Sequence, residues 1–141
     1  MKRLIAIALL SLASLLTAGV AMAADRGAQA NVPFAFNVGD TVFPAGDYTI
    51  SQAGWRPSGV IEIRSTDAKH ATLTTAFGDA AKPVNGGELV FNRYGDRYFL
   101  TEVLCPNGGL SMQLPTSKLE RMVRINEARL STPTQVLVAA K

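Results

Sequence analysis

The strongest local pattern in the chain is residues 88–104, ELVFNRYGDRYFLTEVL. Two runs rich in apolar and aromatic residues flank Gly95-Asp96, and a two-residue loop that contains glycine is typical of a tight β-hairpin. The loop fixes the register, because the residues next to it must oppose each other across the two strands. The sequence therefore predicts that Tyr94 pairs with Arg97, Arg93 with Tyr98, and Phe91 with Leu100.

This register divides the side chains of the hairpin between two faces, since neighbouring residues of a strand point to opposite sides. Both faces are largely apolar, whereas an antiparallel sheet often has one polar side. We therefore expect another element, a ligand or a partner to cover the second face. One predicted face carries Leu89, Phe91, Tyr98, Leu100, Glu102 and Leu104, and the other carries Val90, Phe99 and Val103.

Short strands separated by turn residues are predicted over most of the remaining chain. Runs such as Pro44-Ala45-Gly46-Asp47 are typical of turns. Closely spaced short strands are typical of a β-sandwich or barrel. The sequence therefore predicts a mainly β protein, a seven- or eight-stranded antiparallel sandwich or barrel with one α-helix in the C-terminal region. The further strands are expected at 32–38, around 48–50, and at 61–64, 70–77, 110–114 and 136–139.

The helix is predicted to begin after Ser117, where the periodicity changes. Ser117 and Glu120 have the spacing of a capping box, in which each side chain satisfies a free backbone N–H group. We expect the apolar stripe of this helix to cover the second face of the hairpin. The alternative is a mobile, weakly basic amphipathic segment that docks on a membrane surface. The stripe consists of Leu119, Met122, Val123 and Leu130.

Residues 1–23 have the features of a signal peptide: a basic start, an apolar stretch, and small residues at Ala21 and Ala23. We expect cleavage before Ala24 and export to the periplasm or out of the cell. The apolar stretch is short for a membrane-spanning helix, so we expect no stable membrane insertion after cleavage. The predicted organisation is a signal peptide at 1–23, a flexible segment at 24–30 and a single β-rich domain at 31–141.

Charge and cysteine content limit the possible partners. The chain has 14 basic and 11 acidic residues, and two of the basic ones, Lys2 and Arg3, belong to the signal peptide. The remaining net charge of +1 gives no reason to expect nucleic-acid binding, which needs a clustered basic surface. Cys105 is the only cysteine, so no intramolecular disulfide can form. We expect Cys105 to be buried at a strand end; the alternatives are an intermolecular disulfide and a reactive thiol.

Three stretches of the sequence resemble a group of small exported proteins of environmental bacteria that have no functional name. The resemblance covers nearly all of the chain after residue 23. Its motifs lie on strands and turns, so it implies a fold and no reaction, and it supplies no catalytic or binding residues. The stretches are VPFAFNVG at 32–39 with PAGDY at 44–48, RYGDRYFL at 93–100, and LPTSKLER at 114–121.

The sequence lacks the common catalytic and metal-binding patterns. His70 is the only histidine, and neither a Cys-x-x-Cys zinc motif nor a Gly-x-Ser-x-Gly elbow is present. We therefore predict no enzymatic activity, no metal and no cofactor. Glu102 is the remaining candidate, because a buried carboxylate has a raised pKa and can act as an acid. The alternatives for Glu102 are a position at the sheet margin, a bulge that turns it outward, and an ion pair with Arg93.

These features predict an exported, non-catalytic β-domain that acts as a binding or structural module in the cell envelope or outside the cell. Its partner would be a protein, a polymer or an envelope component. Candidate contact residues are Trp55, Tyr94 and Arg97, because loops and hairpin tips often carry binding residues. The alternative is a β-barrel that carries a small apolar ligand. Its cavity would be lined by Leu89, Phe91, Leu100 and Met112.

Overall fold

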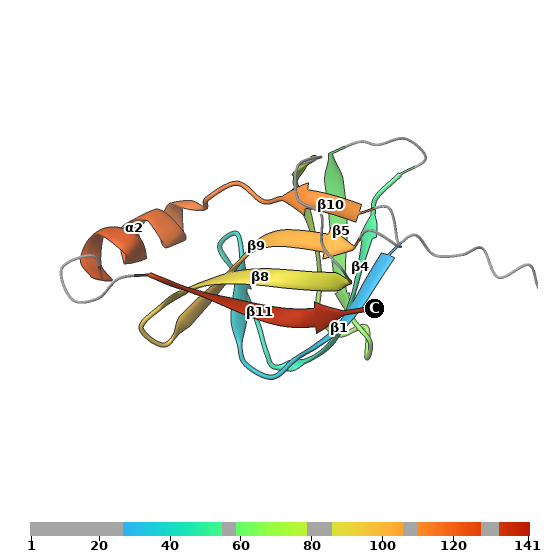
Figure 1. The fold of residues 1–141 in the computed structure, drawn as a ribbon, viewed down its shortest axis with the longest axis horizontal. Coiled ribbons are helices and arrows are strands. Elements are labelled where there is room, and N and C mark those ends of the chain that lie inside the picture. The colour runs from blue at the N-terminus through green and yellow to red at the C-terminus, as the bar shows by residue number, and fades with distance from the viewer. Residues whose placement is uncertain (1–26, 55–58, 79–85, 106–109, 128–132) are drawn as a thin grey trace, which may run out of the picture.

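The computed structural model describes residues 27–54, 59–78, 86–105, 110–127 and 133–141. Within these residues the chain forms eleven strands and one helix (Figure 1). The predicted fold class, a mainly β protein with one helix near the C-terminus, is confirmed. The elements are β1 (Gly27–Val32), β2 (Phe36–Val38), β3 (Thr41–Phe43), β4 (Gly46–Gln52), β5 (Val60–Ser65), β6 (Ala71–Thr75), β7 (Phe77–Gly78), β8 (Gly87–Tyr94), β9 (Arg97–Cys105), β10 (Leu110–Gln113), α2 (Lys118–Glu127) and β11 (Thr134–Ala140).

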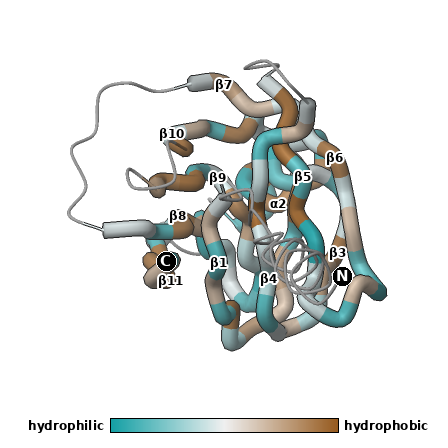
Figure 2. The backbone as a smooth tube through the Cα atoms, turned by 90° about the vertical axis from the view of Figure 1, so that its right-hand side faces the viewer, coloured by the Kyte–Doolittle hydropathy of each residue, from teal (hydrophilic) through white to brown (hydrophobic). Residues whose placement is uncertain are grey.

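All eleven strands belong to one sheet, which curls into a half-barrel (Figures 1 and 2). The order is β3-β2-β9-β8-β11-β1-β4-β5-β6, and β10 pairs with both β9 and β7 beside this path. β7 follows β6 after the single residue Ala76, β7 pairs with β10, and β10 pairs with β9. The series of neighbouring strands therefore leads from β9 around the core and back to β9. The strands outnumber the predicted seven or eight partly because the predicted strands 32–38 and 70–77 are each interrupted, the first at Pro33, which has no N–H to donate.

The predicted hairpin is formed by β8 and β9, and its three predicted residue pairs are present. Gly95 has a φ of +58°, which suits the first central residue of a tight hairpin loop. A β-bulge next to Val90 then shifts the register, and Val90 faces Glu102. Thr101 is the additional residue, and its hydroxyl donates a 3.0 Å hydrogen bond to the carbonyl oxygen of Val90.

The bulge corrects the predicted faces of the hairpin, because one additional residue moves the side chains beyond it to the opposite sides. Val103 is opposite Leu89, and both belong to the main core. Leu104 and Glu102 lie on the other face, so the predicted positions of Val103, Leu104 and Glu102 are wrong. The bulge that was one alternative for Glu102 is present, although the residue is only 8% exposed.

Aromatic side chains fill the interior of the half-barrel. Phe36, Phe43, Tyr48 and Phe91 form a series of ring contacts with centroids 5.0 to 5.8 Å apart. Three of these four contacts are edge-to-face, which is a favourable geometry for aromatic pairs. Cys105 is buried in the same cluster, which confirms its predicted burial.

The N-terminal boundary of the domain differs from the prediction. Residues 27–30 belong to β1, which pairs with β4 along its whole length, and Ala28 is fully buried. The expectation of a flexible segment is therefore wrong for residues 27–30, because alternate small side chains of this strand enter the core. The predicted signal peptide and residues 24–26 lie outside the described residues.

Helix α2 covers part of the second face of the hairpin, as predicted. Val123 packs against Tyr94 and Phe99 in a second buried cluster, with Leu119 partly buried beside them. The Ser117 half of the predicted capping box is present, since the Oγ of Ser117 accepts a 3.0 Å hydrogen bond from the N–H of residue 120. The Glu120 side chain differs from the prediction, because its Oε1 accepts hydrogen bonds from Asn92 and Tyr94 of the hairpin.

The predicted apolar stripe of α2 is wrong at Met122, which is 57% exposed. A helix turns by about 100° per residue, and the side that contacts the sheet contains Glu120 and Val123, both buried. The side of α2 that is buried against the sheet therefore includes the charged residue Glu120, which the predicted apolar stripe did not contain. Leu130 lies outside the described residues.

Candidate interaction surface

Strand β6 forms one end of the sheet, and among the described residues its only strand partner is β5. Its side chains alternate between the two faces. Thr72 and Thr74 are half-buried, opposite Ile63 and Ile61 of β5, which lie in the core. Leu73 points to the outside and is 64% exposed.

Hydrogen bonds at the two ends of the β5–β6 pairing show which backbone groups of β6 point away from β5. The N–H of Ser65 donates to the carbonyl of His70 at 2.8 Å, and the N–H of Ala76 donates to the carbonyl of Gly59 at 2.6 Å. In an antiparallel pair, residues that exchange hydrogen bonds alternate with residues that do not. Even-numbered residues of β6 therefore bond to β5. The backbone N–H and C=O groups of Ala71, Leu73 and Thr75 face the edge.

Among the described residues, no strand pairs with the free side of β6, because β10 does not continue along it. β10 pairs with β7, and extension of the Gln113 register would place Pro115 opposite Thr75. Proline has no N–H to donate to a ladder. The chain also bends away at Leu114, whose N–H donates to the carbonyl of Thr101 at 2.7 Å.

This edge lacks the features that usually prevent further strands from adding to a sheet. Natural edges often carry charges, proline or bulges, but residues 71–77, ATLTTAF, contain no charge and no proline. Residues 71–75 pair with β5 in a regular register. Leu73 and Phe77 are 64% and 65% exposed. We use "β6 edge" for the free side of Ala71–Thr75 together with these two side chains; its five strand residues span about 17 Å.

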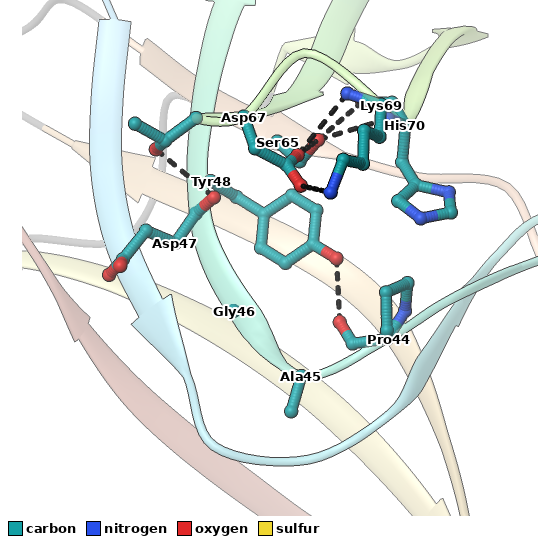
Figure 3. Close-up of a pocket in the computed structure, with 10 residues that line it drawn as sticks. Pro44, Ala45, Gly46, Asp47, Tyr48, Ser65, Asp67, Lys69 and His70 are labelled. Carbon is teal, nitrogen blue, oxygen red and sulfur yellow. Dashed lines mark hydrogen bonds and ion pairs between the residues drawn. The ribbon is translucent and has the colours of Figure 1, made fainter.

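A hydrogen-bonded turn fixes one end of the β6 edge (Figure 3). The Oγ of Ser65 donates to Oδ1 of Asp67 at 2.6 Å and accepts from the N–H of His70 at 3.0 Å. The bond from Ser65, and next the backbone N–H of Lys69, lower the pKa of the Asp67 carboxyl. Ala68 has a φ of +57°, in the left-handed region. The turn thus sets the β5–β6 register through its own polar groups.

A cleft of about 530 Å³ lies between this turn and the β3–β4 connection. Tyr48 lines the cleft, and its hydroxyl donates to the carbonyl of Pro44 at 2.6 Å (Figure 3). Burial, and to a smaller extent the charge of Asp67, raise the pKa of Tyr48. Ser65 bonds to the backbone of His70 and not to its imidazole. The arrangement is therefore that of a structural turn and differs from a Ser-His-Asp triad, in which the imidazole accepts the serine proton.

The described residues provide neither a metal site nor a membrane-spanning helix. Among the described residues, no three His, Cys, Asp or Glu side chains come together as a metal site requires. No helix in the described segments has the length and apolar character needed to cross a bilayer. Asp40, between β2 and β3, contacts the start of α2: its Oδ1 accepts a 3.2 Å hydrogen bond from the N–H of Leu119.

Of the three residues predicted as contacts, only Arg97 is exposed within the described part of the chain. Trp55 lies outside the described residues. Tyr94 is only 5% exposed, so its predicted role as a surface contact is wrong: Val123 of α2 packs against it at the hairpin tip. Arg97 is exposed and lines a cleft of about 320 Å³ together with Leu119.

The residues predicted to line a carrier cavity pack into the main core instead. All four are at most 8% exposed and belong to one cluster of buried side chains. None of them lines either of the two clefts described above. The four residues are Leu89, Phe91, Leu100 and Met112.

Comparison of the chain with protein-family models, curated proteins and solved structures gave no match. The resemblance to small exported proteins therefore stays a prediction. Sequence reasoning predicted the strand at 70–77 but not that it lies at the end of the sheet. The one local signal was its run of residues without charge or proline, ATLTTAF at 71–77.

Proposed function

We propose that this protein is an exported, non-catalytic binding module that accepts an extended segment of another protein as an additional strand on the β6 edge. The observation that supports this function is the open ladder of Ala71, Leu73 and Thr75, whose backbone groups point away from β5. An added strand would satisfy these groups with main-chain hydrogen bonds, and its alternate side chains would provide selectivity.

β3, at the opposite end of the strand order, is less suited to strand addition than β6. β3 has only three residues, follows Asp40 and is followed directly by Pro44. A very short strand next to a charge and a proline is a poor template for strand addition. β6 is longer and has neither feature, so it is the end of the sheet that suits a partner.

The surroundings of the β6 edge indicate the kind of segment that would bind. Glu62 and Arg64 of β5 lie opposite Leu73 and Ala71, and they form an ion pair with each other. Their charges largely offset one another, so the surface beside the edge favours neither sign. We therefore expect a partner segment without strong charge, with β-branched or aromatic side chains next to Leu73 and Phe77.

A peptide-display selection can test this function. Seven-residue random peptides would be selected on the purified protein and compared on two variants of Leu73. Leu73→Pro removes an N–H that faces the edge and leaves the bonds to β5 in place, whereas Leu73→Ala removes only side-chain contacts. We expect the peptides to lose binding to Leu73→Pro and to weaken by no more than about tenfold on Leu73→Ala.

Amide hydrogen exchange of the same complexes supplies an independent measurement. Exchange should slow at Ala71, Leu73 and Thr75 and change little at Thr72 and Thr74, which already bond to β5. Leu73→Lys serves as a second edge variant, since a charge discourages strand addition without loss of the N–H. Selected peptides that bind both edge variants as tightly as the wild type, or that protect other amides, would contradict strand addition.

A further inference from the structure

The outer side of α2 forms a second surface, separate from the β6 edge. Glu120 and Val123 are buried against the sheet, and Leu119 and Glu127 are half-buried. At about 100° per residue, the opposite side of the helix consists of four other residues. We name this set, Lys118, Arg121, Met122 and Ile125, the outer face of α2, with Arg124 at its margin.

The two large apolar residues of the outer face are exposed although the helix is held firmly. Met122 and Ile125 are 57% and 64% exposed. On the sheet side, Oε1 of Glu120 accepts hydrogen bonds from Nδ2 of Asn92 at 3.0 Å and from the hydroxyl of Tyr94 at 3.2 Å. The contact of the helix with the sheet is therefore complete without Met122 and Ile125, and these side chains have no role in fixing the helix.

The exposed charge of α2 is of one sign. Lys118, Arg121 and Arg124 are all exposed, whereas both acidic residues of the helix, Glu120 and Glu127, are turned toward the sheet. Of the nearby carboxylates, Asp40 accepts from the backbone N–H of Leu119 at the start of the helix, and Asp96 lines the same cleft as the half-buried Leu119. The outer face thus combines cations with two large apolar side chains and contains no carboxylate.

We propose that the outer face of α2 binds the surface of an anionic lipid bilayer. A helix with basic and apolar residues can lie in the membrane interface, where Met122 and Ile125 would enter the acyl boundary. Lys118, Arg121 and Arg124 would contact lipid phosphates, and their long stems allow the charges to stay at headgroup level. Each such cation strengthens binding to an anionic membrane about fivefold.

The placement of the helix favours a bilayer over an acidic protein. Figure 1 shows α2 projecting beyond the ends of the strands, so the helix can lie on a flat surface without obstruction from the sheet. The outer face belongs to a convex helix, and its apolar side chains extend into open space. An acidic protein would match the charges, but it would need a groove of its own to bury Met122 and Ile125.

Vesicle flotation tests this proposal. The protein would be purified from the periplasm of an expression host, and mass spectrometry would first verify that no apolar leader remains. Binding is measured to phosphatidylcholine vesicles with and without phosphatidylglycerol. We expect binding to the anionic vesicles only, at least tenfold weaker for Met122→Ser with Ile125→Ser, and about 25-fold weaker for Lys118→Gln with Arg121→Gln.

Matched control variants distinguish binding through the outer face of α2 from non-specific adsorption of the protein to vesicles. Leu137 is 59% exposed on β11 and Lys141 is exposed at the C-terminus, so Leu137→Ser and Lys141→Gln should bind as the wild type does. Thermal unfolding should be unchanged by the Met122 and Ile125 variant. Absent binding to anionic vesicles, equal binding to neutral vesicles, or binding that all variants retain would overturn the proposal. Retention on polyglutamate without vesicle binding would overturn it in favour of an acidic protein.

Discussion

The hydrogen bond between Tyr94 and Glu120 joins the hairpin to α2, and a double-mutant cycle can measure its contribution. The hydroxyl of Tyr94 donates to Oε1 of Glu120 at 3.2 Å, and both residues are at most 5% exposed. The same oxygen accepts from Nδ2 of Asn92. Removal of the carboxylate would therefore leave two donors without this acceptor at a buried interface.

The expected magnitudes follow from the partners of each group. A hydrogen bond to a charged group contributes about 1.5–3 kcal/mol to stability. Tyr94→Phe removes one donor while Glu120 keeps Asn92, so we expect a loss of about 1.5 kcal/mol. Glu120→Leu leaves both donors unpaired and should cost about 3 kcal/mol. Because the two changes remove the same bond, the double variant should lose about 1.5 kcal/mol less than their sum.

Urea unfolding at neutral pH, followed by far-ultraviolet circular dichroism, gives the four free energies of unfolding. The dependence on urea should be the same for all four proteins, since the area exposed on unfolding is unchanged. Glu120→Gln provides a control that keeps an acceptor oxygen and removes the charge. Its free energy of unfolding should lie between those of the wild type and Glu120→Leu. A coupling energy below about 0.5 kcal/mol would refute the reasoning, because independent sites are additive within that range.

Two further predictions concern stability. Val123→Ala should lower the free energy of unfolding by about 1.5–2 kcal/mol, whereas Met122→Ala should change it by no more than about 0.5 kcal/mol; similar losses in thermal unfolding would contradict the packing of α2. Burial raises the pKa values of Tyr48 and Tyr94 above the ordinary 10.0, so the folded protein retains these protons longer than the unfolded chain does. Stability should therefore be unaffected below about pH 10 and fall as the pH rises through the folded pKa values; the same urea-unfolding free energy at about pH 8 and about pH 11 would contradict this.

The sequence predicted the structure correctly where a feature depends on residues close together in the chain. The Gly95-Asp96 loop determines the pairs beside it, and those pairs are present up to Phe91 and Leu100. The prediction failed at Thr101, where the bulge depends on distant contacts. The carbonyl of Thr101 accepts the N–H of Leu114 from beyond β10, and a local pattern contains no information about that contact.

The same limit applies to α2 and to the β6 edge. The capping of the helix by Ser117 is local and was predicted correctly, but the choice of contact side was not. The apolar spacing predicted that Met122 faces the sheet. Glu120 is buried there instead, because Asn92 and Tyr94 of β8 donate hydrogen bonds to its carboxylate. The strand at β6 was likewise predictable, while its position at the end of the sheet depends on where β10 stops pairing.

The described interior of the half-barrel is filled by side chains. Phe36 and Phe91 are in ring contact across the core, which leaves chemical selectivity to groups that the fold leaves exposed. On β6 the inward residues are Thr72 and Thr74, whose hydroxyl groups make the strand less apolar than valine or isoleucine would. Segments prone to assemble into fibrils combine strong β-propensity with high hydrophobicity. Among the described residues, the β6 edge combines outward-facing backbone groups with two exposed apolar side chains, Leu73 and Phe77. If the proposed strand addition is correct, this combination should favour one matching segment over indiscriminate self-association.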